Sequence, residues 1–210
     1  MMQLSAEIRW FWRESPPPGF QDWFCGAGAH ACAAGGGGLR TDQYLRETNQ
    51  GELGIKRRSN HPGVEIKGLV QADFYVLSAP PITGPVELWA KWTGGTFGLP
   101  PGETATIEKV RWMRKYITNG KSVRELPLDV DEMPLGGEAL PEQGCNVELT
   151  QIHLDNVEWW TFGFEAFGQI STLKRSILMA AKSLAPLIPL GGALCASYPA
   201  WFCSIYGGSQ

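Results

Sequence analysis

The stretch LGIKRRSNHPGVEIKG, residues 53–68, contains two short segments of alternating character with a turn-rich cluster between them. Successive side chains of a β-strand point to opposite faces, so residues two apart share a face. Lys56 and Arg58 therefore share one face of the first segment. Glu65 and Lys67 share one face of the second. The intervening residues SNHPG favour a turn. This stretch predicts two antiparallel strands that each carry a charged face.

The same alternation extends over most of the chain. Turn clusters such as SAPPITGP and TNGK separate the segments, and no strand–helix–strand rhythm is present. Short strands at this spacing are typical of an antiparallel sheet or barrel. The predicted strands are residues 5–12, 39–47, 52–58, 63–76, 86–92, 104–117, 145–154 and 158–168.

Together with these strands, the remaining segments predict a mainly β protein of the α+β class. We expect it to fold as one domain over residues 1–210. Helical periodicity, with a plausible N-terminal cap, marks residues 171–184 as a helix. A Gly/Ala-rich run is expected to form a flexible loop because it has few side chains to pack. The other expected features are a short helix near residues 22–25, that Gly/Ala loop at 26–38, an irregular loop at 126–143, and a C-terminal helix with a tail at 171–210.

The composition excludes several classes of protein. A net charge of −3 argues against a binder of duplex nucleic acid and against a polybasic membrane anchor. Residues 183–206 are apolar, but their prolines and glycines interrupt any spanning helix, so no membrane segment is expected. The five cysteines are odd in number and form no CxxC pair, which predicts reduced thiols in a cytoplasmic protein. Cys25, His30 and Cys32 are spaced too irregularly to predict a zinc site.

Charged residues gather on one face of the predicted strands. The opposite face carries apolar residues such as Ile8 and Trp10, which we expect to pack against helices or loops. Basic residues outnumber acidic ones on the charged face, although the whole chain is net acidic. The basic residues are Arg9, Lys56, Arg58, Lys67, Lys91, Lys109 and Arg111, and the acidic ones are Glu7, Glu65, Glu87, Glu148 and Glu165.

This charged face has two interpretations. On an open sheet it faces solvent, and its cross-strand ion pairs contribute little. If the sheet closes into a barrel, the charges converge inside, where each needs a partner or a ligand. Cations interspersed with carboxylates suit a phosphate chain, and the carboxylates could hold a divalent metal ion. We therefore expect a small polyanion as the ligand.

Several short motifs resemble the CYTH, or triphosphate tunnel metalloenzyme, superfamily. They are residues 5–9, DQYL at 42–45, LGIKRR, VEIKG, KVR at 109–111, CNVELTQI and WWTFGFEAFG. The resemblance implies an eight-stranded antiparallel tunnel whose charged interior binds triphosphate. It also implies a metal-dependent hydrolase of phosphoanhydride bonds, with Mg²⁺ or Mn²⁺, acting on tripolyphosphate, a nucleotide or a compound like thiamine triphosphate.

The resemblance also implies roles for individual residues. Glu7, Glu148 and Glu165 match the metal-binding glutamates, and Glu65 and Glu87 would be further tunnel carboxylates. The basic residues Arg9, Lys56, Arg58, Lys67, Lys109 and Arg111 match the positions that grip phosphate, and Lys91 joins them by its place on the same face.

The chain departs from the family pattern at the expected metal site. Ser5, Thr150 and Gly163 stand where further glutamates are expected. A hard cation needs several oxygen ligands, so their loss weakens a site built from charge. Three hypotheses follow: a metal-dependent triphosphatase, a non-catalytic polyphosphate or nucleotide binder, and a barrel for an apolar or carboxylate ligand. Only the third requires the charges to point outward.

Overall fold

The computed structural model describes residues 2–26, 33–34, 39–46, 51–59, 63–95, 99–100, 103–129, 131–184 and 188–206. Its elements in chain order are β1 (Met2–Arg13), α1 (Phe20–Gly26), β2 (Ala33–Ala34), β3 (Arg40–Leu45), β4 (Leu53–Arg58), β5 (Val64–Ala79), β6 (Ile82–Gly94), β7 (Thr104–Asn119), β8 (Ser122–Leu126), η1 (Leu135–Gly137), β9 (Gly144–Leu154), β10 (Val157–Phe167), α2 (Ile170–Ser183), β11 (Leu194–Cys195) and α3 (Tyr198–Tyr206).

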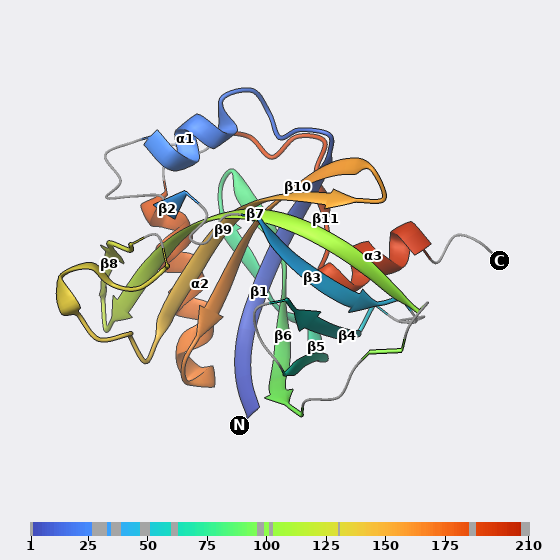
Figure 1. The fold of residues 1–210 in the computed structure, drawn as a ribbon. Helices are drawn as coiled ribbons and strands as arrows, with labels where there is room; N and C mark the ends of the chain where they lie inside the picture. Colours follow the sequence, from blue (N-terminus) through green and yellow to red (C-terminus); the bar gives the residue numbers. More distant parts are fainter. Residues whose placement is uncertain are drawn as a thin grey trace.

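Eight of these strands form a closed antiparallel barrel (Figure 1). Neighbouring strands follow the order β10–β9–β7–β3–β4–β5–β6–β1, and the pairing of β1 with β10 closes the ring. The short strands β2 and β8 pair with β7, and β11 pairs with β1. The predicted mainly β fold with an antiparallel barrel is thus confirmed. Closure satisfies the strand edges that an open sheet would leave unpaired.

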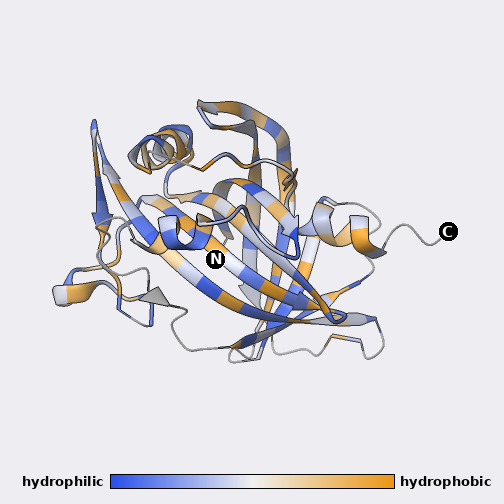
Figure 2. Ribbon diagram, turned by 90° about the horizontal axis from the view of Figure 1, so that it is seen from above, coloured by the Kyte–Doolittle hydropathy of each residue, from blue (hydrophilic) through white to orange (hydrophobic). Residues whose placement is uncertain are grey.

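The pleat separates the two faces of each strand. On β1, the alternate residues Ala6, Ile8 and Trp10 are buried outside the barrel, in one apolar cluster with Leu173 and Ile177 of α2. Figure 2 shows the resulting alternation of hydrophilic and hydrophobic colours along the strands. The expectation that helices cover the apolar face is confirmed, and the hydrophobic core lies largely between the barrel wall and its helices.

The short helices α1 and α3 cover other parts of the barrel. Phe20 and Phe24 of α1 join the same outer cluster as α2. Trp201 and Phe202 of α3 belong to a second cluster at one side of the barrel, where Trp201 stacks on Phe11 at 4.7 Å between ring centroids. Within the described residues, none of the helices combines the length and the apolar character needed to cross a bilayer.

The sequence prediction missed α3 and the short elements β2, β8, η1 and β11. It assigned the last residues to a tail, whereas they form α3, with Pro199 in the first turn, where a proline is tolerated. Ser197 precedes this helix, and its hydroxyl accepts a hydrogen bond from the Ala200 amide at 3.3 Å. The chain between Asn119 and the irregular loop forms β8, a short hairpin partner of β7. Of the predicted Gly/Ala loop, Ala33–Ala34 form β2, and most of the rest lies outside the described residues.

Candidate functional site

A charged cavity lies inside the barrel. Eleven of the twelve charged residues predicted for the site line it, and it has about 890 Å³ of space, part of it open to solvent. Among the described residues, Glu87 is the predicted charged residue that does not line this cavity. Its carboxylate accepts a hydrogen bond from Trp89 Nε1 at 2.9 Å. Lys56, Lys109 and Glu165 all face the cavity, so the charges do not point outward as the third hypothesis requires.

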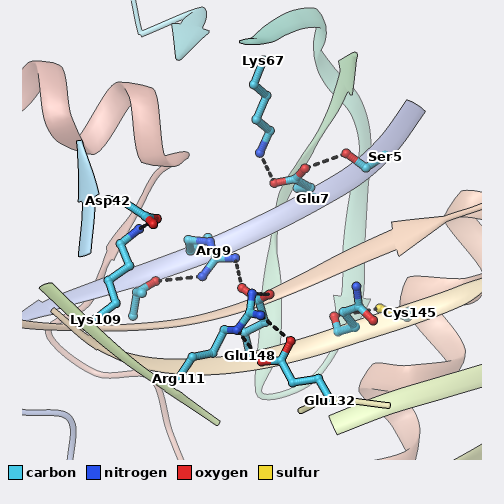
Figure 3. Close-up of polar contacts among 12 residues, drawn as sticks. Ser5, Glu7, Arg9, Asp42, Lys67, Lys109, Arg111, Glu132, Cys145 and Glu148 are labelled. Atoms are coloured by element: carbon cyan, nitrogen blue, oxygen red, sulfur yellow. Dashed lines mark hydrogen bonds and ion pairs between the residues drawn. The ribbon is translucent and has the colours of Figure 1, made fainter. Parts of the chain in front are cut away.

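The first group of contacts surrounds Glu148 on β9. Arg9 Nη2 lies 2.9 Å from Glu148 Oε2, and Arg111 Nη1 lies 3.1 Å from Oε1 (Figure 3). Burial of Glu148 opposes its ionisation, but the two guanidinium groups outweigh that effect and hold its pKa well below the usual value. Arg111 also forms a bidentate ion pair with Glu132, which lies in the irregular loop. One glutamate thus joins two strands that are far apart in sequence.

The second group surrounds Glu65 on β5. Lys56 Nζ lies 2.9 Å from Glu65 Oε1, and Arg58 Nη2 lies 3.0 Å from Oε2. Lys91 Nζ is more distant, at 3.8 Å. Burial alone would raise the pKa of Glu65, but these cations lower it to about 2. Three cations from two strands, β4 and β6, therefore share one carboxylate, which leaves them an excess of positive charge.

The third group surrounds Lys109 on β7. Its ammonium donates to the Tyr44 hydroxyl at 2.8 Å, lies 3.7 Å from Asp42 Oδ2, and sits over the rings of Tyr44 and Tyr198 at 4.7 and 4.1 Å. Burial lowers the pKa of Lys109 well below its usual value, although Asp42 opposes that shift. Arg40 Nε lies 3.1 Å from Asp42 Oδ1. The fully buried Asp42 thus has two basic neighbours.

Four residues of this third group were not predicted as site residues from the sequence. Arg40, Asp42 and Tyr44 alternate on β3, so the same two-residue period could have found them beside the DQYL motif. Tyr198 is different, because it comes from α3. The fold alone carries its ring to the cavity, where it covers Arg9 at 4.8 Å from the ring centroid.

The fourth group surrounds Glu7 on β1. Lys67 Nζ forms an ion pair with Glu7 Oε2, and Ser5 Oγ donates to Oε1 at 2.6 Å (Figure 3). These contacts outweigh the effect of burial and lower the pKa of Glu7. Glu165 stands directly across from Glu7 on β10. Burial, together with Glu7 and Glu148, raises the pKa of Glu165.

The predicted metal ligands do not converge on an ion site. Glu7 is engaged by Lys67, and Glu148 by two arginines. Among the described residues there is no group of three or more His, Cys, Asp or Glu side chains placed to hold a metal ion. The residues in this arrangement therefore do not fit the Mg²⁺ or Mn²⁺ site that the family resemblance implies. His30 and Cys32, considered for zinc, lie outside the described residues.

The three positions where the resemblance predicts further glutamates, Ser5, Thr150 and Gly163, carry no carboxylate. Gly163 pairs in register with both Arg9 and Glu148, and the Arg9 guanidinium occupies the space above it. Thr150 lines the cavity, and its buried hydroxyl has no hydrogen-bond partner among the described residues. Ser5 supports Glu7 by a hydrogen bond. At two of the three positions where the resemblance predicts glutamates, Gly163 and Ser5 thus make contacts that support ion pairs.

Comparisons with known proteins assign this chain to no family. No protein-family model matches this chain, and no curated protein matches its sequence. Membership of the CYTH superfamily stays a prediction from the sequence. The proposed function rests on the geometry of the cavity.

Proposed function

We propose that the barrel binds a small linear polyanion of the triphosphate type. One observation carries the proposal: the cavity wall has eight basic and four acidic side chains, in a chain whose net charge is −3. The basic residues are the seven predicted ones and Arg40, and they come from six strands. An inward concentration of cations is costly unless ligands or carboxylates compensate it. With Asp42 and Glu132, which pair with Arg40, Lys109 and Arg111, six carboxylates face the eight cations, so an excess of positive charge remains.

The distribution of the cations favours a chain of phosphates over a single anion. The groups around Glu148, Glu65, Lys109 and Glu7 occupy different parts of one cavity. Arginine and lysine form strong charge-assisted hydrogen bonds to phosphate oxygens. A linear polyphosphate carries several charged oxygens and can therefore contact more than one group at once. Tripolyphosphate and the triphosphate of a nucleotide or of a compound like thiamine triphosphate share this chemistry.

The shape of the cavity favours a small ligand. Tyr198, Pro199 and Phe202 of α3 form part of the wall. The interior of an eight-stranded barrel is either filled by side chains or holds one small ligand. A duplex nucleic acid is too wide to enter such a space. Cys145, Cys195 and Cys203 are free thiols, and a cytoplasmic setting stays a prediction.

Hydrolysis of the bound chain is the second candidate function, and Glu165 is the observation that favours it. This carboxylate lines the cavity beside Glu7 and Glu148, and its pKa is raised by burial and by those two neighbours. A carboxyl group with a raised pKa suits proton exchange with water. The metal-dependent triphosphatase implied by the resemblance stays a prediction, because the glutamates are engaged by protein cations.

Isothermal titration calorimetry with tripolyphosphate tests binding. We expect saturable binding, with sulfate binding much more weakly because it offers one anionic centre. Arg58→Gln should reduce the affinity about tenfold by removing one charged contact. Arg124→Gln is the matched control, because Arg124 is exposed and pairs with Glu138 outside the cavity. Equal affinity for sulfate and tripolyphosphate, or no binding of either, would contradict the proposal. Phosphate release from tripolyphosphate tests the second candidate.

A further inference from the structure

Three glutamates stand side by side across the barrel wall. In the strand register, Glu7 of β1 lies opposite Glu87 of β6 on one side and opposite Glu165 of β10 on the other. Directly opposed residues of antiparallel strands are close neighbours on one face, and like charges there destabilise a sheet. A row of carboxylates of this kind needs a cation. The question is whether the cation comes from solution or from the protein.

The protein supplies a cation at the centre of the row. Lys67 extends from β5 to Glu7, and Ser5 approaches the other carboxylate oxygen (Figure 3). The Lys67 ammonium also lies 4.9 Å from the centre of the buried Trp89 ring, a position that stabilises a cation. Both oxygens of Glu7 are therefore engaged, and the Lys67 side chain is fixed from two sides.

We propose that Lys67 takes the place of a divalent metal ion at Glu7 and Glu165, so that the barrel binds its polyanion without a metal. The inference rests on the proposed function and specifies how the site is charged. A divalent cation requires several free oxygen ligands at about 2.0–2.6 Å. To provide them, Glu7 would have to release Lys67, whose freed charge would then lie beside the incoming ion.

The rest of the cavity supports the same conclusion. Lys91 is the register partner of Lys67, so the region around Glu7 already holds a second ammonium. Glu148 is shared by Arg9 and Arg111. The excess of basic side chains in the wall repels a free divalent cation and attracts an anion. A tethered cation also remains in place when the ligand leaves.

The first test uses the unaltered protein. Calorimetry with tripolyphosphate is carried out in EDTA and again with Mn²⁺ in place of EDTA. We expect binding in EDTA. Binding that requires Mn²⁺ would overturn the inference but leave the proposed function intact. Absence of binding under both conditions would overturn the proposed function itself, so the two failures are distinguishable.

The second test measures Mn²⁺ binding by electron paramagnetic resonance, with protein and metal alone. The wild-type protein should bind no Mn²⁺ at this site. Lys67→Met keeps an apolar contact with Trp89 and frees Glu7, so it should gain Mn²⁺ binding. In EDTA its affinity for tripolyphosphate should fall about tenfold, and Mn²⁺ should restore it. Lys174→Met is the matched control, because Lys174 also lies over an aromatic ring, 4.4 Å from the Phe74 centroid, but does not line the cavity, and it should gain no Mn²⁺ binding.

Tight Mn²⁺ binding by the wild-type protein, or no gain in Lys67→Met, would contradict the inference. Circular dichroism establishes that the variant is folded. If Lys67→Met does not fold, Lys67→Gln replaces it in the same measurements, and the comparison of EDTA with Mn²⁺ on the wild-type protein decides the question independently.

Discussion

The guanidinium group of Arg9 lies directly over Gly163, its register partner on β10: a Cβ atom added at Gly163 would stand 2.9 Å from Arg9 Cζ. Gly163 also pairs with Glu148 on β9. The glycine therefore leaves space for the Arg9–Glu148 ion pair to form across the intervening strand. A glutamate at this position, as the family pattern expects, would occupy the space that Arg9 now fills.

Gly163→Ala should weaken this ion pair. The added methyl group forces Arg9 to move, and overpacking of this kind costs about 1–3 kcal/mol of the free energy of unfolding. Urea denaturation measures the loss, and calorimetry should show weaker tripolyphosphate binding. Gly94→Ala is the control, because a Cβ at Gly94 meets no atom within 4 Å. Equal stability of the two variants would show that Arg9 is free to move.

Glu148→Gln should destabilise the empty barrel. Glu148 neutralises Arg9 and Arg111, and removal of one partner of a buried ion pair costs about 3–5 kcal/mol. Arg9 then lacks its carboxylate partner, whereas Arg111 keeps Glu132. The unpaired Arg9 should gain more from a bound anion, so tripolyphosphate should raise the melting temperature of this variant more than that of the wild type. Glu138→Gln removes an exposed ion pair and should leave the melting temperature unchanged. A smaller ligand-induced shift in Glu148→Gln would contradict this role.

Glu65 should make the stability depend on pH in acid. Its pKa is lowered from 4.5 to about 2 in the folded protein, so the unfolded chain binds its proton first as the pH falls. Stability from this group is therefore fully present above about pH 4.5 and is lost as the pH falls through about 2. The shift corresponds to about 3 kcal/mol. Urea denaturation of wild type and Glu65→Gln from neutral pH to pH 2 checks this, and the variant should have the shallower profile. Parallel profiles would refute the assignment.

Thr150 and Thr161 face each other across β9 and β10 but should respond differently to valine. The buried Thr150 hydroxyl has no hydrogen-bond partner within the described chain, so Thr150→Val should raise the unfolding free energy by about 1 kcal/mol. Thr161 accepts a hydrogen bond from Arg9 Nη1 at 3.4 Å, so Thr161→Val should lower it. Urea denaturation compares them, and a loss of stability in Thr150→Val would point to a partner for its hydroxyl.

Much of the barrel could be predicted from the sequence because the pleat of a strand is a local property. The two-residue period placed Glu7 and Arg9 on one face and Ile8 on the other, and the structure agrees. The same period brought the predicted charges together, apart from Glu87, which contacts Trp89. The fold class and the inward charged face follow from residues that lie near each other in the chain.

The partners of those charges were decided by closure of the barrel. Arg9 and Glu148 are 139 residues apart, and they meet because β1 pairs with β10 and β10 with β9. Lys67 reaches Glu7 because β6 joins β5 to β1. The register between distant strands depends on backbone hydrogen bonds along the whole ring. The two-residue period of a single strand carries no information about that register. Sequence alone therefore established which side chains share a face, whereas the tertiary structure decided which charges neutralise one another and brought Tyr198 of α3 to cover them.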